Sequence, residues 1–184
     1  MKFTPTSIAG VFVVETEIRG DDRGTFMRIY CAAEQKKQTG FEKPIAQANR
    51  SVTAQKGSLR GLHYQRAPAL ESKMVRCTRG RVFDVAVDLR AGSETFLQHV
   101  SVALDSAQGN ALLIPEGCAH GFQTLEDDCE MIYLHTAPYS PAHEGGLAFD
   151  DPKLGIRWPL AVAQMSERDR SFPPLDGNFK GIAS

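Results

Sequence analysis

The sequence has few of the features that mark disulfide-bonded or zinc-binding proteins. Its four cysteines are Cys31, Cys77, Cys118 and Cys129, and no two of them form a C-x-x-C pair. Neither a disulfide framework nor a zinc site is therefore indicated. We expect these four side chains to be small buried or half-buried groups.

Long apolar runs and an excess of one charge are also missing. No stretch approaches the roughly 20 apolar residues needed to cross a bilayer, and residues 1–10 lack a basic segment followed by a hydrophobic one. The formal net charge of -1 gives no global electrostatic reason to expect nucleic acid or an anionic membrane as a partner. Local basic clusters can still bind a small anion, and we expect a cytoplasmic protein.

What the sequence does contain is a succession of short β-prone runs separated by turn signals. The runs cover residues 11–14, 25–30, 45–51, 59–65, 73–78, 82–89, 98–104, 111–114, 121–125 and 129–135. This spacing favours an all-β sandwich or barrel over βαβ units. Gly80 and Gly109 supply residues that tolerate positive φ where tight hairpins need them. With no repeat or linker in 184 residues, we expect one domain over residues 1–184.

Two segments are expected to be helical, and both are short. Residues 32–38 have helix-forming composition and end at Gly40, a suitable C-cap. After Tyr139 the chain is rich in turns and prolines, which predicts an irregular C-terminal segment. A short helix is predicted near Ser166, because Ser166 and Asp169 fit a capping box with Asp in place of Glu.

The segment 57–65 contains the first candidate for chemistry, His63. It alternates like a half-buried strand, so we expect residues 58, 60, 62 and 64 on one face and 59, 61, 63 and 65 on the other. On that pattern His63 shares its face with Gly61 and Gln65, which suits a polar cavity better than an apolar core. The alternative is a buried histidine satisfied by one hydrogen bond.

The second half of the chain contains the second motif of the cupin double-stranded β-helix, G-x5-P-x-G-x2-H. Gly109, Pro115, Gly117 and His120 fit this spacing, although Thr124 replaces the final Asn. The motif supports a jelly-roll fold.

The first cupin motif is degenerate. Gly57 and His63 fit its opening, but Gln65 stands where the second histidine of H-x-H is required. With His63 and His120 as the only motif histidines, we expect no firmly bound transition metal. The remaining histidines, His99, His135 and His143, are expected to be surface or incidental groups.

Over nearly the whole chain the sequence resembles the dTDP-4-dehydrorhamnose 3,5-epimerases. The resemblance lies in residues 22–24, Gln47 with Asn49, and residues 59–65, 73–77, 83–89, 114–122, 151–152 and 158–159. It implies a cupin jelly roll with short peripheral helices, no metal or organic cofactor, and a nucleoside-diphosphate sugar as substrate. It also implies a homodimer in which an N-terminal strand reaches the site of the partner subunit.

The chemistry that the resemblance implies needs a base, an oxyanion stabiliser and a proton donor. A C4 ketone acidifies the neighbouring C3–H and C5–H bonds, and inversion requires the base and the donor on opposite faces of the sugar. By resemblance, His63 is the base, Asp169 pairs with it, Lys73 faces the C4 oxygen and Tyr133 is the donor. Without the resemblance, Asp169 would be interpreted as part of a helix cap; the two roles are compatible.

The resemblance also implies a set of substrate-binding residues. Arg23 and Arg60 match positions that hold the diphosphate, for which a guanidinium is suited because it binds paired oxygens. Polar contacts to the nucleotide-sugar are expected from Gln47 and Asn49. His120 is expected to shape the pocket and support the substrate. Arg28 and Tyr139 complete the expected set.

Several residues depart from the family pattern around the substrate. Arg28 stands where the family commonly has Glu, residues 48–50 read Ala-Asn-Arg in place of Asp-Asn-His, and Leu134 and Pro138 replace a Lys and an aromatic. Tyr139 is then the neighbouring ring available to stack on a base or sugar. These changes bear on the nucleotide and its contacts more than on the type of reaction.

The sequence therefore predicts an epimerase of a nucleoside-diphosphate 4-keto-6-deoxyhexose, acting through an enolate at C3, C5 or both. Double 3,5-epimerisation of the dTDP sugar is the preferred form, and a 3-only or 5-only enzyme, or one using CDP, stays open. From other classes, a metal-dependent cupin enzyme and a non-catalytic nucleotide-sugar binding module are the alternatives.

Overall fold

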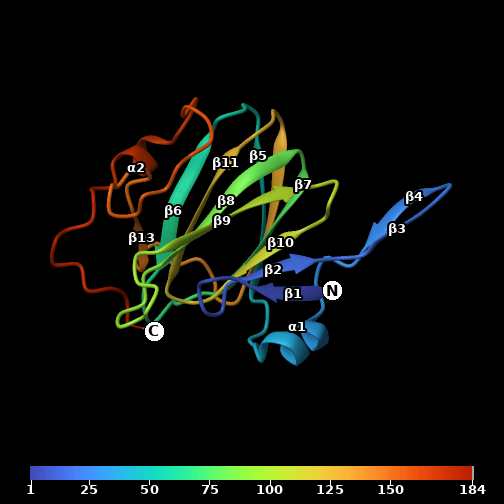
Figure 1. Ribbon diagram of the computed structural model, residues 1–184, viewed down its shortest axis with the longest axis horizontal. Coiled ribbons are helices and arrows are strands. Elements are labelled where there is room, and N and C mark those ends of the chain that lie inside the picture. The colour runs from blue at the N-terminus through green and yellow to red at the C-terminus, as the bar shows by residue number, and fades with distance from the viewer. Residues whose placement is uncertain (184) are drawn as a thin grey trace.

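Two facing antiparallel sheets form the body of the computed structural model, which describes residues 1–183 (Figure 1). The six-stranded sheet has the order β1 (Lys2–Pro5), β2 (Phe12–Glu15), β10 (Ala111–Ile114), β7 (Lys73–Arg79), β12 (Cys129–His135) and β5 (Gln47–Thr53). The five-stranded sheet has the order β13 (Glu144–Gly146), β6 (Leu59–Gln65), β11 (Cys118–Thr124), β8 (Arg81–Asp88) and β9 (His99–Asp105). The predicted all-β jelly-roll class is confirmed.

The main hydrophobic core lies between the sheets. Val75 of β7 and Met131 of β12 pack in one cluster with Ala86 of β8 and Phe122 of β11, all at most 1% exposed. Alternation of side chains along each strand sends every second residue into this core. The cluster fills only part of the space between the sheets, and polar side chains line the rest.

The irregular C-terminal segment covers the outer face of the five-stranded sheet. Val85 and Val87 of β8, which alternate with the inward-facing Ala86, pack against Leu154 and Leu175 of this segment. It also contains α2 (Glu167–Arg170), which lies beside β6 (Figure 1). The C-terminal segment thus brings a short helix to one end of the sandwich.

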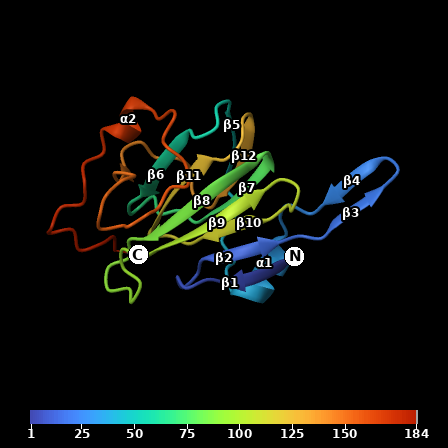
Figure 2. The same ribbon diagram turned by 45° about the horizontal axis from the view of Figure 1, so that its top comes forward.

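A hairpin of β3 (Ile18–Asp21) and β4 (Gly24–Met27) extends away from the two sheets in both ribbon views (Figures 1 and 2). Its side chains are almost all exposed, and Phe26 is 73% exposed. The helix α1 (Ala32–Thr39) follows and lies beside β1. Within residues 1–183, no helix has the length and apolarity that a membrane span requires.

Most predicted elements are present. All ten β-prone runs contain a strand, and both short helices form, with Gly40 at φ 74° ending α1 and Ser166 capping α2. The run at 25–30 was too long, because the strand ends at Met27. The strands β1, β3 and β13 were not predicted. Cys31 is half-buried and the other three cysteines are buried, as expected.

The expected alternation along β6 is wrong between Arg60 and His63. The register with β11 pairs His63 with His120 but Arg60 with Phe122, so β6 has one extra residue at this point. Such a bulge turns Arg60 and His63 to the same side. At its centre, Gly61 has φ 114°, and a Cβ there would lie 2.7 Å from the Cα of Gly121. Only glycine fits this close approach, so the bulge depends on the packing of β6 against β11.

Candidate active site

A cavity of about 930 Å³ opens between the two sheets at the end that the core does not fill. Its size lies in the range of small-molecule sites. Nine of the predicted site residues line it: Gln47, Asn49, Arg60, His63, Lys73, His120, Tyr133, Tyr139 and Asp169. The structure therefore brings together side chains from β5, β6, β7, β11, β12 and α2.

His63 and Asp169, which are 106 positions apart in the sequence, are in direct contact. The Nε2 atom of His63 lies 2.8 Å from Oδ1 of Asp169, and the backbone N–H of Gly61 donates to Oδ2 at 3.1 Å. The same residue closes the cap of α2, where its backbone N–H donates to Oγ of Ser166 at 3.0 Å. The helix cap and the histidine pair thus coexist, and the cap fixes the position of the carboxylate.

The local environment keeps Asp169 ionised. Burial by itself raises the pKa of this carboxyl, but the hydrogen bond and charge of His63 and the Gly61 N–H lower it to about 2. An ionised Asp169 holds the imidazole with its proton on Nε2, which leaves the lone pair on Nδ1. The ring of Phe172 packs edge-on against His63, with centroids 6.0 Å apart, and limits its rotation.

Tyr133 of β12 comes from the opposite sheet. Its phenol oxygen lies 3.1 Å from Oγ of Ser51, and burial raises its pKa to about 12. The ring is held between His120, edge-on at 6.2 Å, and His135, stacked at 6.0 Å. The phenol is therefore neutral at physiological pH and fixed in direction, as a proton donor requires.

His120 is the cross-strand neighbour of His63 and has its own carboxylate. Its Nε2 lies 2.8 Å from Oδ2 of Asp84, and the Asp84 side chain is 0% exposed. Burial raises the pKa of this carboxyl above its ordinary value. This buried pair fixes the ring of His120 in the cavity wall beside Tyr133.

Lys73 begins β7 and has a buried ion-pair partner that sequence reasoning missed. Its ammonium lies 2.8 Å from Oε1 of Glu71, and Nδ1 of His135 lies 2.8 Å from Oε2 of the same carboxylate. Burial raises the pKa of Glu71, but His135 and Lys73 together lower it to about 2. The expectation that His135 is an incidental group is wrong, since it lines the cavity two residues after Tyr133.

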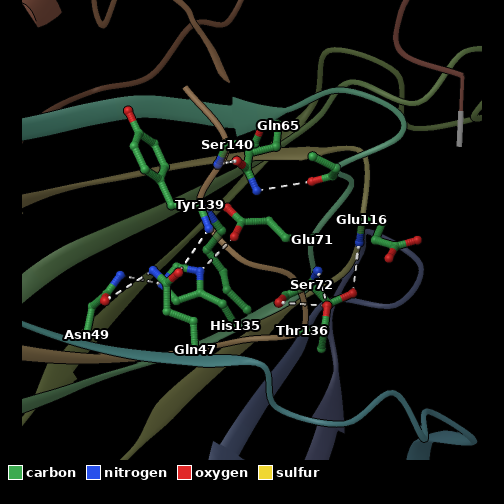
Figure 3. Close-up of polar contacts among 12 residues, drawn as sticks. Gln47, Asn49, Gln65, Glu71, Ser72, Glu116, His135, Thr136, Tyr139 and Ser140 are labelled. Carbon is green, nitrogen blue, oxygen red and sulfur yellow. Dashed lines mark hydrogen bonds and ion pairs between the residues drawn. The ribbon is translucent and has the colours of Figure 1, made fainter. Parts of the chain in front are cut away.

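Three of the residues expected to bind the nucleotide-sugar, Gln47, Asn49 and Tyr139, are connected by hydrogen bonds (Figure 3). Gln47 accepts a hydrogen bond from the backbone N–H of Tyr139 at 2.9 Å and donates to Asn49 at 3.2 Å. The guanidinium of Arg60 donates to the hydroxyl of Thr53 at 3.0 Å. These contacts hold polar groups and one positive charge along one wall of the cavity.

Arg168 is a second residue that sequence reasoning missed. Its Nη1 lies 2.8 Å from a carboxylate oxygen of Glu144, which also accepts from the hydroxyl of Tyr139. Its Nη2 lies 3.1 Å from Nε2 of His63, so a permanent positive charge stands beside the imidazole. The only sequence signal was a basic residue in the short predicted helix.

Arg23 and Arg28 do not line this cavity. Arg23 lies at the turn of the β3–β4 hairpin and pairs with Asp21, while Arg28 follows the hairpin and pairs with Glu34. Both lie on or next to the segment that extends away from the sheets (Figure 2). In this arrangement neither side chain reaches the cavity of its own chain.

Comparison with known proteins supports one family. Residues 5–177 match the family model of dTDP-4-dehydrorhamnose 3,5-epimerase. The enzyme of that name from Sinorhizobium fredii is 44% identical over 95% of this chain and 90% of its own length. A 3,5-epimerase from Legionella pneumophila, solved with dTDP-4-keto-L-rhamnose, superposes with a TM-score of 0.92 at 36% identity, covering 100% of this chain and 98% of that chain.

A 3'-monoepimerase from Streptomyces bikiniensis, solved with dTDP-quinovose, also matches, with a TM-score of 0.87 at 35% identity over 92% of this chain and 86% of that chain. The same fold thus occurs in enzymes that differ in the number of carbons inverted. With a family model matched over most of its length, the chain belongs to the dTDP-4-dehydrorhamnose 3,5-epimerase family.

Proposed function

We propose that the protein inverts C3 and C5 of dTDP-4-keto-6-deoxyglucose by removing a proton on one face of the sugar and returning one on the other. One observation carries the proposal: the His63–Asp169 pair and Tyr133 line the same cavity from opposite sheets. A flat enolate bound between the sheets would have a base on one face and a neutral phenol on the other.

Each step of the reaction has a side chain to perform it. Nδ1 of His63 takes the proton next to the C4 ketone, and Asp169 stabilises the imidazolium that forms. The ammonium of Lys73 stabilises the negative charge that develops on the C4 oxygen. Tyr133 then donates its proton to the opposite face, and exchange with solvent returns a proton to its phenolate and removes one from the His63 imidazolium before the next carbon reacts. Because these side chains supply every role, the proposed reaction needs no metal or organic cofactor.

The proposed working unit is a homodimer in which the β3–β4 hairpin of one subunit reaches the cavity of the other. The hairpin stands away from its own sheets and exposes Phe26, which suits burial against a second copy. It would bring Arg23 and Arg28 to the open side of the cavity, where Arg23 and Arg60 together would hold the diphosphate. Arg23→Ala should then raise KM for the nucleotide sugar more than it lowers kcat.

Solvent exchange tests the function directly. The protein is incubated in D2O with dTDP-4-keto-6-deoxyglucose, and deuterium at C3 and C5 is followed by NMR. Deuterium at both carbons supports the double epimerase, and deuterium at one carbon supports the restricted form. Its absence from both, with saturable binding of the sugar nucleotide, would support a binding module.

Two further measurements separate the remaining alternatives. His63→Ala should abolish exchange, and unchanged exchange in this variant would remove His63 from the role of base. Treatment with a chelator should leave the exchange rate unchanged, whereas its loss would favour a metal-dependent cupin. The C3-restricted form is the second candidate, because a monoepimerase shares this fold at 35% identity. The CDP sugar, supplied in parallel, tests the choice of nucleotide.

A further inference from the structure

Glu71 is a buried carboxylate in the cavity wall that the proposed mechanism does not use. Its side chain is 9% exposed, and the two groups that it contacts, Lys73 and His135, are 7% and 11% exposed. Removing charges from water is costly unless they are paired and hydrogen-bonded. A carboxylate in this position therefore has to be fully engaged by its neighbours.

A chain of hydrogen bonds leads from Gln47 through Asn49 and His135 to Glu71 (Figure 3). Gln47 donates to Oδ1 of Asn49, and the amide of Asn49 donates to Nε2 of His135 at 3.3 Å. His135 consequently has its proton on Nδ1, from which it donates to Glu71 at 2.8 Å. The ammonium of Lys73 donates to the other oxygen of Glu71. Both carboxylate oxygens are thus held, one by a chain of side chains that begins at β5.

This arrangement fixes the position of the Lys73 ammonium. An ammonium on a flexible four-carbon stem is a poor oxyanion stabiliser unless something fixes its position before the charge develops. Glu71 engages one of the three N–H groups of Lys73 and leaves the others available to the substrate. His135 in turn prevents Glu71 from following the ammonium if it moves.

We propose that Glu71 is a positioning residue of the epimerase, which fixes Lys73 against the C4 oxygen and is itself fixed by His135. The proposal rests on the proposed function, because it assigns the oxyanion role to Lys73. A purely structural ion pair would stabilise the fold without affecting the reaction. In this proposal Glu71 affects the reaction, and it does so only through Lys73.

A double-mutant cycle tests this dependence. Glu71→Gln keeps the shape of the side chain and removes the charge, and it should lower kcat about 10- to 100-fold with KM within about threefold, the effect of a misplaced catalytic group. Lys73→Met should lower kcat about 10²- to 10³-fold through loss of the oxyanion contact. The double variant should be no slower than Lys73→Met alone. His135→Phe, which keeps the stacking on Tyr133, should give a smaller fall in kcat that also disappears in the Lys73→Met background.

The control is Glu116→Gln. Glu116 forms a more exposed ion pair with Lys43 outside the cavity, and its variant should have the turnover of the unmodified protein. Thermal unfolding of every variant checks folding. The positioning role is wrong if the double variant loses kcat by the product of the two single reductions. It is also wrong if Glu71→Gln has the kcat of the unmodified protein. If Lys73→Met itself keeps full turnover, or the unmodified protein exchanges no proton, the proposed function fails instead.

Discussion

Replacing Asp169 by Asn tests the histidine pair with little change in shape. The pKa of this carboxyl falls from the ordinary 3.8 to about 2, despite burial, because the folded protein favours its charged form. At roughly 1.4 kcal/mol per pKa unit, the net preference is about 2 kcal/mol. If His63 carries a full positive charge after proton removal, an uncharged Asn forfeits a stabilisation of that order. The expected result is a fall of about 10- to 100-fold in the rate of proton removal.

The assay for Asp169→Asn is the initial rate of deuterium incorporation from D2O, measured at saturating substrate. Asp150→Asn serves as the matched control, since Asp150 is exposed and lies outside the cavity. An Asn can still accept the Gly61 N–H, and the cap of α2 uses a backbone group, so the variant should fold, with a thermal midpoint at neutral pH lowered by no more than the loss of the carboxylate charge explains. An exchange rate within twofold of the unmodified protein, in a folded variant, would refute the role assigned to the carboxylate.

Three other outcomes are expected. Tyr133→Phe should slow inversion more than proton removal, and because the pKa of this phenol is about 12, the unmodified enzyme should show no activity loss from its ionisation below about pH 11. Gly146→Ala should lower kcat, because a Cβ there would lie 2.1 Å from the Phe172 ring, which packs on the proposed base. The control is Gly177→Ala, whose Cβ would meet nothing within 4 Å and which should leave kcat unchanged. The lowered pKa of Asp169 contributes stability that is present above about pH 4 and lost as the pH falls towards about 2. Asp169→Asn should therefore flatten the dependence of the thermal midpoint on pH in that range.

The strands that form the walls of the cavity could be predicted because each contains a short β-prone run bounded by turn residues. The predicted bounds of β6, β10 and β12 match the structure. The second cupin motif is also local in origin: Gly117 has φ 78°, and a Cβ there would lie 2.5 Å from the Arg90 side chain. Backbone demands of this kind are visible in a single sequence, because few residues meet them.

The parts that could not be predicted depend on contacts between distant segments. The bulge in β6 adds one residue against β11, and nothing in the alternation of residues 59–65 shows it. Glu71 lies outside any strand, so no periodicity directs it to Lys73. His135 is a different case, because it follows Tyr133 by two residues on one strand and the period of two already places both on the same face.

The division of roles between the two sheets explains why this fold suits inversion. The proposed base, His63, lies on β6 of the five-stranded sheet, and Lys73 and Tyr133 lie on β7 and β12 of the six-stranded sheet. Facing sheets in a sandwich stand about 10 Å apart, a gap that a flat sugar ring can occupy between two layers of side chains. Residues on one sheet then reach one face of the ring and residues on the other sheet reach the opposite face. A base and a donor on the same sheet would return the proton to the face from which it came. The β6 bulge lets His63 and Arg60 reach the cavity together, since without it they would point to opposite sides of their own sheet.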